Sequence, residues 1–140
     1  MAAPVLGPEG IGALKLGMTR AQAEATGVVA PFENKPNSDT CLWRSQLRGA
    51  AAGKGVVLHS EDLGVATLDA YDGVQTPEGI TLGSSLAEVR RAYPDWRYNT
   101  DVGRGDAKVP GNDRAVYRIA IAGGNVVQLT LQYASQGCYE

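Results

Sequence analysis

Apolar and polar residues alternate along two runs near the end of the chain. In the first run, Tyr117, Ile119 and Ile121 fall on one side of an extended strand, while Arg118 falls on the other. Such alternation predicts two strands of an antiparallel sheet that has one buried face and one solvated face. The second run has the same period, with polar Gln128, Thr130 and Gln132 alternating with apolar Val127, Leu129, Leu131 and Tyr133.

The segment between these two runs predicts a tight hairpin. It reads Ala122-Gly123-Gly124-Asn125, and glycine accepts the positive φ that two-residue turns require. Three further strand-like runs cover residues 41–47, 55–60 and 65–71. Strand signals therefore occur in both halves of the chain, without showing whether they join one sheet or two.

Two short helices are predicted by the same start signal. In a capping box, a hydroxyl residue and a Gln or Glu three positions later each accept a hydrogen bond from the other's backbone N–H. The chain has this arrangement at Thr19 and Gln22, and again 66 positions later at Ser85 and Glu88. We therefore expect helices that begin at Thr19 and at Ser85.

The ends of both helices are also marked. Glycine suits the left-handed position that closes many helices, so the first helix is expected to end at Gly27. The second is expected to stop at about Tyr93, because Pro94 cannot continue the hydrogen-bond ladder. Within it, Leu86 and Val89 recur at helical spacing and form an apolar stripe that a sheet must cover.

The repeated helix start predicts two copies of one structural unit. The spacing of the two signals is nearly half the chain length, so we place the first α+β repeat at residues 1–75 and the second at residues 76–140. Both are expected to belong to one compact body. The predicted fold class is α+β, with two tandem helix-plus-antiparallel-sheet repeats whose helices pack on one sheet face.

Composition and charge narrow the class of partner. The 140 residues are 44% hydrophobic and 20% charged, with a formal net charge of −2, which is typical of a globular chain. The sequence has no run of Lys and Arg, the pattern that nucleic acids and anionic membrane surfaces select. Its apolar stretches are too short to cross a bilayer. We therefore expect no nucleic-acid partner and no membrane span.

Two cysteines, Cys41 and Cys138, leave two interpretations open. The chain has no Cys-x-x-Cys pair and a single histidine, which excludes a thioredoxin-like motif and a four-ligand zinc site. A disulfide across this separation restricts the unfolded chain by about 4 to 5 kcal/mol in the chain-entropy model. The alternative is two unpaired thiols that pack as small hydrophobic side chains.

The N-terminal residues bear on localisation. Met1-Ala2-Ala3-Pro4 lacks the basic and apolar regions of a signal peptide. Small residues after an initiator Met fit a mature secreted protein, and they also fit a native cytosolic N-terminus. We expect secretion, with the signal peptide absent from the sequence as given.

His59 is the single histidine and the best candidate for a catalytic base. It lies beside Ser60 and Glu61 in a strand-like run, where neighbouring side chains point to opposite faces and do not form a relay. The sequence has no Gly-x-Ser-x-Gly elbow, HExxH motif or Walker loop, and no acidic run with the ligand spacing of a calcium loop. We therefore expect no catalytic residue, no cofactor and no metal ligand.

The residues that open the first helix carry a family resemblance. The segment Leu16-Gly17-Met18-Thr19-Arg20-Ala21-Gln22-Ala23, followed by Thr26-Gly27, resembles the helix-opening motif of the streptomycete β-lactamase inhibitory proteins. More loosely, it is similar to BamE/SmpA-like envelope domains and to secreted actinobacterial proteins with a glycine-rich form of the motif. The resemblance implies tandem helix-plus-sheet repeats, secretion and inhibition of an enzyme. The inhibitors carry a cysteine pair in each repeat, whereas Cys41 and Cys138 fall in different predicted repeats.

Side chains suited to protein binding gather on the expected solvated sheet face and in the segment 93–111, which we take as a loop. Aromatic and Arg side chains dominate the energetics of protein interfaces. For Trp96 the alternative is burial against the helix, because large aromatic side chains are usually mostly buried. The predicted protein-binding residues are Trp96, Tyr98, Arg104, Arg118, Gln128, Thr130 and Gln132, with Thr67 and Asp69 as neighbours on the sheet.

Three functions remain as hypotheses. The first is a secreted, non-enzymatic protein-binding module that acts as an inhibitor or as an adaptor in an extracellular complex, with another secreted or envelope protein as its partner. The second is a structural module of cell-envelope assembly. The third is a small hydrolase whose site carries no recognisable motif.

Overall fold

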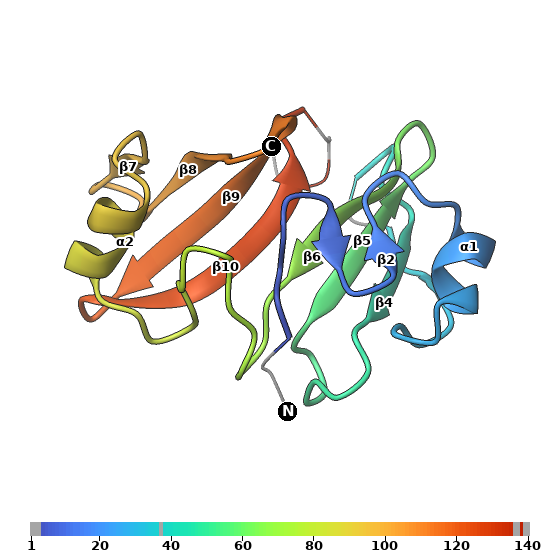
Figure 1. The fold of residues 1–140 in the computed structure, drawn as a ribbon. Coiled ribbons are helices and arrows are strands. Elements are labelled where there is room, and N and C mark those ends of the chain that lie inside the picture. Colours follow the sequence, from blue (N-terminus) through green and yellow to red (C-terminus); the bar gives the residue numbers. More distant parts are fainter. Residues whose placement is uncertain (1–3, 37, 136–137, 139–140) are drawn as a thin grey trace.

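An eight-stranded antiparallel sheet forms the body of the molecule, together with two short helices and a two-stranded hairpin (Figure 1). The computed structural model describes residues 4–36, 38–135 and 138. In spatial order, the strands of the sheet are β3 (Glu33–Asn34), β4 (Trp43–Gln46), β5 (Val56–Ser60), β6 (Gly64–Asp69), β10 (Asn125–Tyr133), β9 (Asn112–Ala122), β8 (Arg104–Val109) and β7 (Arg97–Asn99). The other elements are β1 (Gly10–Ile11), β2 (Leu14–Lys15), α1 (Arg20–Ala25) and α2 (Leu86–Ala92).

The predicted α+β fold of two tandem helix-plus-sheet repeats is wrong. The molecule is mostly β, since α1 and α2 have six and seven residues while β9 and β10 have eleven and nine. The eight strands form one continuous sheet, in which β6 and β10 pair at the centre. The two helices are about as short as the sequence predicted, so the difference lies in the sheet, which gains β7 and β8 and joins both halves of the chain through β6 and β10.

The division of the chain at residues 75 and 76 stays a prediction. This point lies between β6 and α2, so β3 to β6 precede it and β7 to β10 follow it. The expectation about the N-terminus concerns Met1-Ala2-Ala3-Pro4, of which residues 1–3 lie outside the described part of the chain.

The segment 93–111, expected as a loop, contains two strands. β7 and β8 pair with each other, and β8 pairs with β9. The inward positions of β8 carry small residues, so the two-residue period has little hydrophobic contrast. The period is visible once the strand is known, because charged Arg104, Asp106 and Lys108 alternate with Gly105, Ala107 and Val109.

One apolar core lies between the helices and one face of the sheet. Ala23 of α1 and Val89 of α2 are fully buried and belong to the same cluster as Leu68, Tyr117 and Leu131. The register pairs Tyr117 with Leu131 and Leu131 with Leu68, so neighbouring strands present a continuous apolar row to the helices. Burial of each such large side chain contributes about 1.5–3 kcal/mol.

Both predicted capping boxes are confirmed. Thr19 Oγ1 accepts from the Gln22 N–H at 3.1 Å, and Gln22 Oε1 accepts from the Thr19 N–H at 3.0 Å. Ser85 and Glu88 repeat the arrangement at 3.1 and 2.8 Å. Helices this short have little stability of their own, so the caps and the buried faces fix where they form.

The predicted hairpin between β9 and β10 is also confirmed. Gly123 and Gly124 have φ values of 62° and 83°, the conformation that two-residue antiparallel turns require. They join Ala122 to Asn125, which face each other in the register. This turn sets the alignment of the two longest strands of the sheet.

Cys41 and Cys138 form a disulfide, and their Cα atoms lie 5.4 Å apart. Both residues are buried, in a second apolar cluster that includes Val56, Leu58 and Ala66. The bond joins the segment after β10 to the residues just before β4. Of the two interpretations of the cysteines, the structure shows the bonded one.

Removing the disulfide is predicted to destabilise the fold. The double variant Cys41→Ser with Cys138→Ser frees a loop closed across 97 residues, and we expect its free energy of unfolding to fall by about 2–5 kcal/mol. Urea unfolding followed by circular dichroism measures the difference. A free energy within about 0.5 kcal/mol of the parent protein would contradict the expectation, because that is the size of a neutral surface change.

Gly105 is predicted to be essential for the pairing of β7 with β8. A Cβ atom built at Gly105 lies 2.1 Å from the Arg97 carbonyl oxygen, so Gly105→Ala must push the two strands apart. We expect a loss of about 1–3 kcal/mol in thermal or urea unfolding. Gly7→Ala is the matched control, since its Cβ meets nothing closer than 3.8 Å and neither glycine has a positive φ. Equal stability of the two variants would contradict the steric argument.

Candidate protein-binding face

The second face of the eight-stranded sheet carries most of the polar residues that the sequence singled out. Leu68, Tyr117 and Leu131 point into the core, so the residues that alternate with them lie on the opposite side. We call this side the open sheet face. Directly paired residues of antiparallel strands have side chains on the same face, so the register gives its layout.

Three rows of side chains cross the open sheet face. Each row follows the printed pairs from strand to strand. The first runs from β7 to β6 and consists of Arg97, Asp106, Arg118, Thr130 and Asp69. The second runs from β8 to β3 and consists of Lys108, Val116, Gln132, Thr67, Leu58, Arg44 and Glu33. The third consists of Asn99, Arg104, Ala120 and Gln128.

The centre of the open sheet face is a packed polar layer. Thr67 and Thr130 are fully buried, and Gln132 is 4% exposed. Thr130 Oγ1 donates a hydrogen bond of 2.5 Å to Asp69 Oδ1, across the pairing of β10 with β6. Thr67 Oγ1 and Gln132 Oε1 have no hydrogen-bond partner among the described residues. Buried polar atoms without a partner are rare in folded proteins, so this layer retains unused hydrogen-bonding capacity.

Asp69 has a perturbed carboxyl group. Burial raises its pKa from the ordinary 3.8 to about 6, against the hydrogen bond from Thr130 and the positive charges of Arg118 and Arg44, which act in the opposite direction. Removal from water disfavours the charged carboxylate more than these three groups favour it. The carboxyl group therefore changes charge within a mildly acidic range of pH.

Longer charged side chains surround this layer and form the surface that a partner meets. Arg44, Arg97, Arg104 and Lys108 are all exposed. The rows contain five cationic side chains, including Arg118, and three carboxyl groups, those of Glu33, Asp69 and Asp106. Because the whole chain has a net charge of −2, the open sheet face is positive against an acidic remainder. Such a surface attracts acidic surfaces.

The disulfide covers one part of the open sheet face. Val56 and Leu58 point to this side, opposite to Val57 in the core, and both pack in one cluster with Cys138. The covered part therefore lies over β5. The charged residues of β7, β8 and β9 belong to the part beyond it.

The structure brings five of the seven predicted binding residues together. Arg104, Arg118, Gln128, Thr130 and Gln132 all lie on the open sheet face, with Thr67 and Asp69 beside them on β6. The two-residue period of β9 and β10 identified the four that lie on these strands, whereas Arg104 of β8 was chosen for its residue type in the segment 93–111.

Trp96 and Tyr98 lie elsewhere. Trp96 is 9% exposed, packs in the core, and donates from Nε1 to the Gly105 carbonyl at 2.9 Å. Tyr98 stacks on it with ring centroids 4.6 Å apart and pairs in register with Gly105, on the core side of the sheet. The alternative of burial therefore describes Trp96, while a binding role for either residue stays a prediction.

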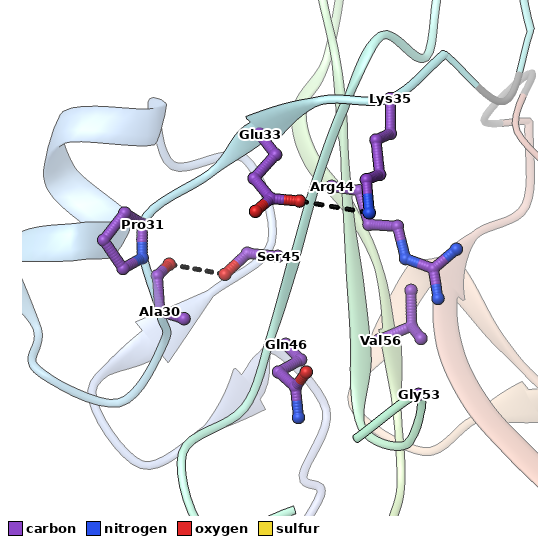
Figure 2. Close-up of a pocket in the computed structure, with 9 residues that line it drawn as sticks. All are labelled: Ala30, Pro31, Glu33, Lys35, Arg44, Ser45, Gln46, Gly53 and Val56. Carbon is purple, nitrogen blue, oxygen red and sulfur yellow. Dashed lines mark hydrogen bonds and ion pairs between the residues drawn. The ribbon is translucent and has the colours of Figure 1, made fainter. Parts of the chain in front are cut away.

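A pocket of about 330 Å³ lies at the β3–β4 edge of the sheet (Figure 2). Arg44, Gln46 and Val56 belong to its lining and lie on the open sheet face. Arg44 is not among the binding residues predicted from the sequence. The available signal was the alternation of Trp43 and Ser45 with Arg44 and Gln46. The full lining is Ala30, Pro31, Glu33, Lys35, Arg44, Ser45, Gln46, Gly53 and Val56.

His59 lies in a different pocket, on the other side of the sheet. It is 8% exposed, packs edge-on against Phe32, and its Nδ1 has no hydrogen-bond partner among the described residues. Burial lowers its pKa, and the nearby charge of Arg20 adds to this effect. Ser60 Oγ accepts hydrogen bonds from the N–H groups of Asp62 and Leu63, so this hydroxyl holds the turn between β5 and β6.

Among the described residues, no group of three or more His, Cys, Asp and Glu side chains is arranged to hold a metal ion. Within the same part of the chain, no helix has the length and apolar character needed to cross a membrane.

The comparisons with known proteins support the fold alone. No known family profile and no curated protein matches the chain significantly. A solved structure, the crystal structure of the uncharacterized protein yfeY from Escherichia coli, is similar with a TM-score of 0.60. Its sequence is 11% identical, and the match covers 91% of this chain and 99% of that chain. At this identity the likeness concerns the arrangement of the strands and not the activity.

The carboxyl group of Asp69 predicts a particular pH dependence of stability. Its pKa is higher in the folded protein than in the unfolded chain, so the folded state binds more protons between about pH 4 and pH 6. Stability therefore rises as the pH is lowered from 7 to 4, by on the order of 2 kcal/mol relative to Asp69→Asn, which keeps an oxygen acceptor for Thr130. Urea unfolding of both proteins across this range measures the difference. Parallel pH profiles would contradict the raised pKa.

Proposed function

We propose that this chain is an extracellular, non-enzymatic protein-binding module that docks another protein on its open sheet face. In this role it acts as an inhibitor or as an adaptor in a secreted complex. The observation that carries the proposal is the polar and charged surface that runs across neighbouring strands on one side of the sheet, while the other side is the apolar core.

The disulfide supports an extracellular location. The Cys41–Cys138 bond is compatible with an oxidising environment, where such bonds form and persist. The resemblance of the segment that opens α1 to secreted inhibitory proteins points to the same compartment, and it is the source of the inhibitor form of the proposal.

The composition of the open sheet face supports a protein partner. It is a broad surface of exposed arginines around a polar centre, and Arg is enriched in protein interfaces. The net positive charge of its rows in a chain of net charge −2 favours an acidic partner surface. Charge complementarity of this kind raises the association rate and selects among partners.

The polar centre supports a rigid docking surface. Thr130 and Asp69 are bonded across two central strands, and both lie in extended backbone held on either side by further strands. This hydrogen bond holds the two strands together, so the exposed charged side chains around the polar centre are presented from a sheet that binding does not have to order.

Charge reversal on this face is predicted to weaken binding at least tenfold. The tagged protein captures its partner from culture supernatant and from an envelope fraction, and mass spectrometry under non-reducing conditions identifies that partner. The variant Arg104→Glu with Lys108→Glu places two negative charges on the open sheet face, and we expect at least a tenfold loss of captured partner.

The matched control makes the same change of net charge on the other side of the sheet. Arg90→Glu with Arg91→Glu alters two exposed arginines of α2, and we expect capture to persist. Equal capture by the two variants would overturn the docking face. Capture of the partner only from the envelope fraction, with the same dependence on Arg104 and Lys108, would assign the docking face to a structural envelope module and overturn the inhibitor and adaptor roles.

A further inference from the structure

We propose that the pocket beside Arg44 binds a carboxylate side chain, Asp or Glu, of the protein partner. The inference rests on the proposed function, because this pocket opens at the edge of the same docking face. It names the chemistry that the partner presents at one fixed point.

Arg44 supplies the positive group. It is exposed, and it takes part in no hydrogen bond or ion pair among the described residues. The nearest acidic residue in the register is Glu33, directly opposite Arg44 on β3. Glu33 Oε2 instead lies 3.2 Å from Lys35 Nζ. Figure 2 shows the Arg44 guanidinium directed away from this ion pair and over Val56.

The charge of the pocket favours an anion. Arg44 and Lys35 are cationic, and Glu33 is the single carboxylate among the lining residues. Because Glu33 is already paired with Lys35, its repulsion of an incoming carboxylate is reduced. A guanidinium can donate two parallel hydrogen bonds to one carboxylate, which makes this pair stronger and more directional than a lysine contact.

The walls of the pocket are held in place before a ligand arrives. Ser45 Oγ donates to the Ala30 carbonyl, which fixes the two sides of the pocket relative to each other. Gln46 Nε2 donates to the carbonyls of Ala50 and Ala51 at 3.2 and 3.1 Å. These bonds order the lining, so binding does not have to organise it.

The size and lining of the pocket fit an acidic residue of a protein. Its volume of about 330 Å³ leaves room for an acidic side chain together with the adjoining main chain. Val56, Ala30 and Pro31 offer apolar surface for the methylene groups, while Arg44 meets the carboxylate. Arg44 lies in the same row as Gln132 and Thr67, but Leu58 of β5 stands between them. Because the disulfide cluster packs over Leu58, a partner docked on the charged strands must extend past the disulfide to reach the pocket.

The test uses a defined peptide as a probe. The ¹⁵N-labelled protein is titrated with acetylated and amidated tetraglutamate, and in parallel with tetraglutamine, while amide chemical shifts are recorded by NMR. We expect tetraglutamate alone to shift the amides of Arg44, Gln46, Gly53 and Val56. The shifts are expected to decrease as the salt concentration is raised, because an exposed ion pair is screened.

Two variants assign the binding to one side chain. Arg44→Gln removes the charge and is expected to weaken tetraglutamate binding about two- to fivefold, the effect of losing one exposed ion pair. Arg48→Gln removes another exposed arginine, which lines a different pocket, and we expect the affinity of this variant to stay unchanged. Equal shifts with tetraglutamine, or equal affinity of the Arg44→Gln variant and the parent protein, would overturn the inference.

The outcome is independent of the capture experiment. If partner capture depends on Arg104 and Lys108 while the affinity for tetraglutamate does not change in the Arg44→Gln variant, the pocket inference fails and the docking face stands. If tetraglutamate binding requires Arg44 while partner capture does not change in the Arg104→Glu, Lys108→Glu variant, the pocket binds a carboxylate and the proposed docking face is wrong.

Discussion

The pairing of β6 with β10 is the interaction on which the rest of the molecule depends. Three pairs of residues join these strands, and the two side chains of each pair lie on the same face of the sheet. Leu68 faces Leu131 in the core, while Asp69 faces Thr130 on the open sheet face. Without this seam the first four strands and the last four would not form one sheet, and neither the continuous core nor the rows of polar side chains would exist.

The seam also explains the properties of the polar centre. Central strands have a paired strand on each side, so a side chain on a central strand contacts side chains of two other strands. Thr130 is fully buried at this position, and burial raises the pKa of Asp69 beside it. At the outer strands, side chains such as Arg97 and Arg104 remain exposed. A single sheet thus carries a buried polar centre and an exposed charged periphery on one face.

Local signals in the sequence predicted the parts of the fold that depend on neighbouring residues. The caps at Thr19 and Ser85, and the hairpin at 122–125, follow from hydrogen bonds and backbone angles within a few residues. The seam joins Asp69 to Thr130 across 61 positions, and no local pattern contains that information. The fold class was wrong for the same reason, since helix starts are local whereas the extent of a sheet is set by distant pairing.

The candidate face could be predicted where apolar and polar residues alternate clearly along a strand. It could not be predicted where the role of a side chain depends on contacts with residues distant in the sequence. Most of the predicted residues lie on it because they share the two-residue period of β9 and β10. Trp96 was drawn into the prediction by its residue type, but its indole binds the Gly105 carbonyl within the fold. Arg44 was missed because its lack of a partner follows from the pairing of Glu33 with Lys35, which only the structure shows.

The measurement that tests the account most directly is the arginine Nε–Hε NMR spectrum of the protein, free and in complex with its captured partner. The account predicts that the signals of Arg44, Arg97 and Arg104 shift or broaden on binding, while those of Arg90 and Arg91 on α2 stay in place. The reverse pattern, with changes confined to α2, would show that the partner docks on the helical side and would contradict the account.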